Sequence, residues 1–83
     1  MSPASIKSMR KRLGLTQHSM AKAFGVSTLT MSQYETGFRN PGPTALILLE
    51  ILDSLPKKKA LELFELFSKK AKSLKNERSE KGT

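Results

Sequence analysis

Glycine and proline residues divide the sequence into five short segments, and this division limits the fold to a set of short helices. The breaks fall at Gly14, Gly25, Gly37, the segment 40–43 and Pro56. Within the segments, apolar residues recur in steps of three and four, which is the period of an amphipathic helix. None shows the apolar–polar alternation typical of a strand. We therefore expect an all-α fold, a compact five-helix bundle.

Most of the predicted helices begin at a residue suited to that position. Ser2, Thr16 and Ser27 carry hydroxyl groups that can cap a helix N-terminus, and Pro43 is favoured in a first turn. The predicted helices cover residues 3–13, 17–24, 28–35, 44–55 and 57–76. A chain of 83 residues has room for one domain. We expect that domain to comprise residues 1–76, followed by a polar flexible tail at 77–83.

The helices predicted on either side of Gly25 form the most informative part of the sequence. Gly25 can adopt the positive φ angle that a sharp turn needs, and helices joined in this way cross at roughly 90–120°. Ala21 is small enough for such a close crossing. The apolar residues that would face inwards are Met20, Phe24, Val26, Met31 and Tyr34. We therefore predict a helix-turn-helix here, with an ordinary helical hairpin as the alternative.

The charge of the chain favours a polyanionic partner. Fifteen lysine and arginine residues against seven acidic residues give a formal net charge of +8. Nucleic acid and an anionic membrane surface are the two partners that this surplus suggests. Binding of single-stranded RNA is the weaker nucleic-acid alternative, because the core needs most of the four Phe and one Tyr, which leaves few for stacking on bases.

Residues 6–55 resemble the helix-turn-helix family of phage Cro and repressor proteins, also called the XRE family. The resemblance lies in Thr16-Gln17, Ala21, Gly25-Val26-Ser27, Tyr34-Glu35-Thr36-Gly37 and Asn40-Pro41. It implies a lambda-repressor-like DNA-binding domain whose third helix enters the major groove of double-stranded DNA.

The resemblance also implies roles for individual residues. Base edges would be contacted by Thr28, Leu29, Ser32 and Gln33. The amide of Gln33 can pair with adenine, whereas Leu29 departs from the polar residue common in the family and leaves the base preference open. DNA phosphates would be contacted by Gln17, Ser27, Thr36, Arg39 and Asn40. An ion pair between Arg10 and Glu35 would hold the third helix to the rest of the domain.

The predicted helix 57–76 carries more apolar side chains than a four-helix core needs. One part of its apolar face could pack onto Ile47, Ile51 and Leu55. The remainder would form an interface between two copies of the chain. The residues assigned to that dimer interface are Leu61, Phe64, Phe67 and Leu74. A homodimer would read a pseudo-palindromic operator whose half-sites are about 34 Å apart. The alternative is that the whole face packs onto the core.

Taken together, these features predict a sequence-specific DNA-binding transcription regulator of bacterial or phage type, acting as a repressor. The alternative is the antitoxin of a toxin–antitoxin pair, which would bind a toxin protein through its C-terminal helix and autoregulate its operon. A peptide that lies on a membrane surface is a further alternative for residues 57–75. It does not explain residues 6–55.

We expect no enzyme activity, metal site or cofactor. His18 is the only histidine, Asp53 is the only aspartate, and the chain has no cysteine. No nucleophile stands at a recognisable spacing from a base, so no catalytic residue is assigned. Without disulfides, a signal peptide or an apolar run of about 18 residues, the chain is expected in the cytoplasm, away from membranes.

Overall fold

The described part of the chain contains five helices and no strand, as the sequence predicts. A computed structural model describes the backbone of residues 1–82 and the side chains of residues 1–74. Its helices are α1 (Pro3–Arg12), α2 (Gln17–Phe24), α3 (Thr28–Thr36), α4 (Pro43–Ser54) and α5 (Lys57–Gly82). Helix α5 continues past the predicted end at Asn76. The side chains of the predicted tail, residues 77–83, lie outside the described residues.

Local hydrogen bonds explain where the first three helices begin. The hydroxyl groups of Ser2, Thr16 and Ser27 each accept a hydrogen bond from the backbone N–H three residues later, at 3.0 to 3.1 Å. Each bond satisfies one of the N–H groups that have no partner inside the helix. Because these bonds join residues close in sequence, the helix starts can be predicted without knowledge of the tertiary structure.

Two glycines in the left-handed region end α2 and α3. Gly25 has a φ of 70° and Gly37 a φ of 83°. Residues other than glycine rarely adopt these backbone angles. At Gly37 space is also limited, since an added Cβ would lie 3.2 Å from Cγ of Pro3.

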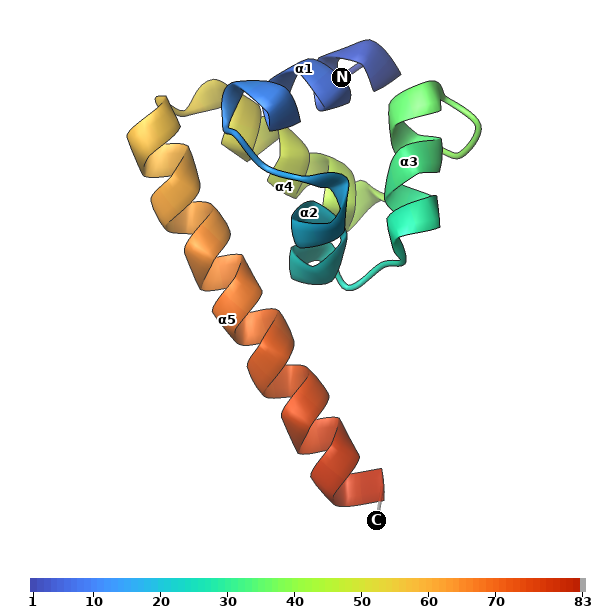
Figure 1. Cartoon of the computed structure of the whole chain (residues 1–83), viewed down its shortest axis with the longest axis vertical. Coiled ribbons are helices and arrows are strands. Elements are labelled where there is room, and N and C mark those ends of the chain that lie inside the picture. Colours follow the sequence, from blue (N-terminus) through green and yellow to red (C-terminus); the bar gives the residue numbers. More distant parts are fainter. Residues whose placement is uncertain (83) are drawn as a thin grey trace.

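The core lies where the first four helices meet. Its fully buried large side chains are Ile6, Met9, Met20, Met31, Leu49 and Leu52. Helix α5 closes the core by burying Ala60 and Phe64. Figure 1 shows the rest of α5 continuing beyond the other helices as a single straight element. Within the described residues, no helix is both long and apolar enough to cross a membrane.

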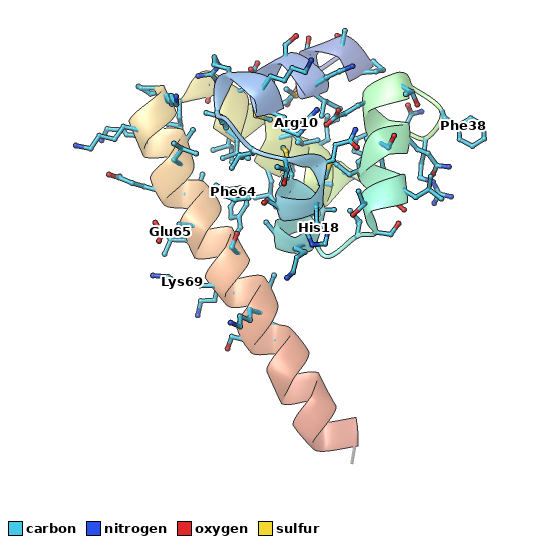
Figure 2. The ribbon with its side chains drawn as sticks, viewed as in Figure 1. Arg10, His18, Phe38, Phe64, Glu65 and Lys69 are labelled. Atoms are coloured by element: carbon cyan, nitrogen blue, oxygen red, sulfur yellow. The ribbon has the colours of Figure 1, made fainter. Side chains whose placement is uncertain are left out.

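The packing of α5 differs from the prediction in two respects. Helix α5 packs mainly against α2, where the rings of Phe24 and Phe67 meet edge to face at 5.8 Å. Ile47 and Ile51, the predicted contacts on α4, are instead 58% and 40% exposed. Phe64, assigned to the dimer interface, belongs to the core of the single chain and points from α5 towards α2 (Figure 2). The prediction used helical spacing alone, which cannot show which neighbouring helix covers an apolar face.

Candidate DNA-binding face

Helix α3 is attached to α2 by a short, well-defined turn. Gly25 supplies the left-handed backbone, and the N–H of Val26 donates a 3.0 Å hydrogen bond to the carbonyl of Ala21. Ala21 is buried between the helices, as its small size predicts. Ser27 then caps α3. The direction of α3 is therefore fixed by local backbone geometry and by the helix crossing at the buried Ala21.

The two sides of α3 differ in character. Met31 and Tyr34 are buried in the core, whereas Thr28, Leu29 and Thr36 are exposed. Ser32 and Gln33 are half-buried. All four residues assigned to base contact lie on α3, and none of them is charged. Such a surface can lie against base edges because no charged side chain has to lose its water there.

A buried charged network joins α3 to α1. Nε of Arg10 donates to one carboxylate oxygen of Glu35 at 2.7 Å, and Nη2 donates to the other at 3.1 Å. Nη1 of Arg10 also donates to the carbonyl of Leu15 at 2.9 Å. The side chains of Arg10 and Glu35 are only 11% and 2% exposed. The two-bond geometry fixes α3 against α1 in both distance and orientation.

The carboxylate of Glu35 stays ionised although it is buried. Burial by itself raises the pKa of Glu35. Hydrogen bonds from Arg10 and Gln17 and the positive charges of Arg10 and Lys7 outweigh this effect, so the pKa lies below its ordinary value of 4.5. The network therefore keeps its charge throughout the neutral pH range.

Gln17 belongs to this network, a role that the sequence did not reveal. Its Nε2 donates to Glu35 at 3.1 Å, and the side chain is half-buried. Gln17 and Glu35 are far apart in sequence, so no local spacing indicates the contact. The phosphate contact implied by the family resemblance remains a prediction for Gln17. In the free chain, its amide group already binds Glu35.

His18 is placed beside the start of α3. Its Nδ1 lies 3.3 Å from the hydroxyl oxygen of Thr28, and both residues are exposed. Figure 2 shows His18 on α2, next to the turn that leads into α3. The structure adds that His18 lies next to a residue assigned to base contact.

Hydrogen bonds also shape the loop after α3. The carbonyl of Gln33 accepts a bond from the hydroxyl of Thr36 at 3.3 Å and from the backbone N–H of Arg39 at 3.2 Å. Phe38 is 80% exposed, and its ring points away from the protein (Figure 2). Arg39 and Asn40 are exposed in the same loop. The structure thus places two of the residues assigned to phosphate contact beyond the C-terminal end of α3.

The remaining assigned residues divide into two groups. Ser27 is exposed, but its hydroxyl is used to cap α3. Leu61 and Phe67 are half-buried on α5, and Leu74 is 59% exposed. The base-contact and phosphate-contact sets therefore lie on and around α3. The residues assigned to the dimer interface lie along α5, and one of them, Phe64, is buried in the core.

Comparison with known proteins identifies the family of the chain. Residues 1–67 match the family model described as the antitoxin component of a bacterial toxin–antitoxin system, MqsA. Antitoxin MqsA of Escherichia coli (strain K12) is 38% identical over 56 residues. The match covers 68% of this chain and 43% of that protein, so the chain spans less than half the length of this relative. No solved structure matches the chain. The match over residues 1–67 shows that the chain belongs to the MqsA antitoxin family.

Proposed function

We propose that the chain is the DNA-binding antitoxin of a bacterial toxin–antitoxin pair, which binds its own operator through α3 and also holds a toxin protein. Membership of the MqsA family supports the antitoxin role over the free repressor that the sequence first suggested. The XRE-type resemblance supports α3 as the helix that enters the major groove.

The exposed face of α3 is the observation that carries the DNA-binding part of this proposal. It is uncharged, and the Arg10–Glu35 network fixes its position. Positive side chains elsewhere on the surface, which give the chain a net charge of +8, attract the phosphates of DNA. Affinity thus comes from distributed positive charge, whereas base discrimination comes from the short polar groups of α3.

The homodimer remains part of the proposal, with its interface moved to α4. Ile47 and Ile51 lie one helical turn apart and are exposed. Helix α4 contains no lysine or arginine. Its acidic residues lie near positive groups of the same chain, Glu50 at 3.6 Å from the N-terminal amino group and Asp53 at 3.9 Å from Arg12. Repulsion between two basic copies is therefore small at this face.

The DNA-binding role is tested with the duplex that precedes the gene. Thr28→Ala is compared with Thr44→Ala, because both threonines are exposed near the start of a helix and only Thr28 lies on α3. We expect Thr28→Ala to weaken operator binding measured by fluorescence anisotropy, and Thr44→Ala to leave it unchanged. Equal affinities for the two variants would contradict the assignment of α3 to the major groove.

A further inference from the structure

A groove on the surface between α2 and α5 has no role in the proposed DNA contact. It is lined by Ser19 and the C-terminal half of α2, the following turn, Leu48 of α4, and the part of α5 from Phe64 to Leu74. None of the described residues that line it belongs to α3. Its volume of about 1160 Å³ exceeds the roughly 300–1,000 Å³ of small-molecule pockets.

The floor of the groove is apolar. We call its apolar lining residues the floor, and these are Ala23, Phe24, Val26, Leu48, Phe64, Phe67, Ala71 and Leu74. Leu74 is 59% exposed, and the edge-to-face pair of Phe24 and Phe67 joins the two helices at the base. Aromatic and aliphatic groups that remain in contact with water gain free energy when another apolar surface covers them.

The rim of the groove is basic. Lys22, Lys70 and Lys72 are exposed there, and the described lining residues include no aspartate or glutamate. Figure 2 shows Glu65 and Lys69 on the outer side of α5, pointing away from the other helices. An occupant must therefore combine an apolar stripe with negative charges on its flanks.

The shape of the groove favours a helical occupant. Helix α5 has 26 residues, a length of about 39 Å at 1.5 Å per residue, and Figure 1 shows it continuing past the end of α2. The part of α5 from Phe64 to Leu74 forms one wall of the groove. A helix that lies along this wall would present residues at i, i+3, i+4 and i+7 to the apolar floor.

Double-stranded DNA and a second α5 fit the groove less well. A DNA backbone offers phosphates to the lysines but no apolar surface to cover Phe67 and Leu74. A second α5 would bring its own lysines to the rim, where like charges repel. An acidic amphipathic helix would cover the apolar floor and would also place negative charges beside the lysines of the rim.

We propose that this groove binds an acidic amphipathic helix of the toxin. The identity of the partner rests on the proposed antitoxin function, whereas the chemistry of its helix follows from the groove. Because the groove and the exposed face of α3 are built from different residues, a helix bound in the groove leaves the residues assigned to base contact uncovered.

The test uses the full-length chain labelled with ¹⁵N and a synthetic helical peptide. The peptide has about 18 residues, or five turns, with leucine along one face and glutamate on the others. A second peptide carries lysine in place of glutamate. We expect the acidic peptide to shift the amide signals of Ala23, Phe24 and Ala71 and to leave those of α3 in place. The basic peptide should cause no shift.

Charge reversal at the rim gives the decisive comparison. Lys70→Glu with Lys72→Glu should weaken binding of the acidic peptide about tenfold, since two attractive rim charges become repulsive. Lys57→Glu with Lys59→Glu changes the net charge equally but lies outside the groove, and should keep the affinity within about twofold. Both double variants replace exposed residues, and their folding is checked by circular dichroism.

Four results would overturn the proposal. These are the same loss of affinity in both double variants, peptide-induced shifts on α3, no groove shifts at millimolar peptide, and groove signals that move with protein concentration alone. The last result would assign the groove to a second copy. A separate titration with the operator duplex measures DNA binding through α3. A chain that binds the peptide but not the duplex would refute the DNA-binding proposal and leave the groove proposal standing.

Discussion

The Arg10–Glu35 pair provides the sharpest test of how this fold is held together. Arg10→Met removes the guanidinium and keeps an apolar side chain of similar length in its place. The carboxylate of Glu35, whose side chain is 2% exposed, then loses two of its three hydrogen bonds. Only the amide of Gln17 would still donate to it.

The expected loss of unfolding free energy is large for a domain of this size. Removing one partner of a buried ion pair costs about 3–5 kcal/mol, because an uncompensated charge is left in the interior. We expect a value of roughly 3 kcal/mol, since Gln17 stays in place and water can enter the space at Arg10, which is already 11% exposed. The total free energy of unfolding of a small domain is only about 5–15 kcal/mol.

Urea unfolding followed by far-ultraviolet circular dichroism measures this change. Arg12→Met is the matched control, because Arg12 lies 3.9 Å from Asp53 and both side chains are about half exposed. Arg12→Met should lower the free energy of unfolding by at most about 1 kcal/mol. The double variant Arg10→Met with Glu35→Leu removes both charges, and should recover most of the stability lost by Arg10→Met alone.

The dependence on pH provides an independent test with a definite sign. In the intact chain the pKa of Glu35 lies below 4.5, so its contribution is complete above that value and is lost as the pH falls through the lowered pKa. In Arg10→Met, burial becomes the dominant influence and raises the pKa above its ordinary value. The stability lost in this variant should therefore shrink as the pH is lowered from neutral.

Two results would refute this account. A loss below about 1 kcal/mol for Arg10→Met would mean that the pair is solvated and contributes as surface pairs do. A loss that does not change with pH would mean that Glu35 is not buried as an unpaired carboxylate in the variant.

Four further predictions concern α3, the loop after it, the contact of α3 with α2, and the proposed dimer. Gln33→Ala should weaken operator binding by about 1–3 kcal/mol and relax the preference at one base pair per half-site. Arg39→Ala should weaken binding to all duplexes and reduce the salt slope by about one. Equilibrium titrations on operator and random DNA at several salt concentrations check both. Ala21→Leu should lower the unfolding free energy by about 1–3 kcal/mol because the buried crossing has no room for a larger side chain; unchanged urea unfolding would contradict this. Ile47→Glu with Ile51→Glu should give a folded monomer in sedimentation experiments, whereas Leu66→Glu, at an equally exposed leucine of α5, should remain dimeric; a dimeric double variant would exclude the α4 interface.

The sequence determined the parts of this protein that depend on near neighbours in the chain. Ser27 and Gly37 set the two ends of α3 through a cap bond and a left-handed backbone, and both effects act within a few residues. The size of Ala21 predicted its burial because a sharp turn at Gly25 brings two helices close together. Arg10 and Glu35 could be paired only through the family resemblance, since 25 residues separate them.

Only the tertiary structure decided which surfaces are covered. Helical spacing showed that α5 has a wide apolar face, but several neighbouring helices could have covered it. The packing of α5 on α2 buried Phe64, left Ile47 and Ile51 exposed, and opened the groove beside Phe67. The bond from Gln17 to Glu35 likewise depends on how α2 and α3 approach. Such contacts depend on the positions of whole helices, and a local pattern of residue types does not specify those positions.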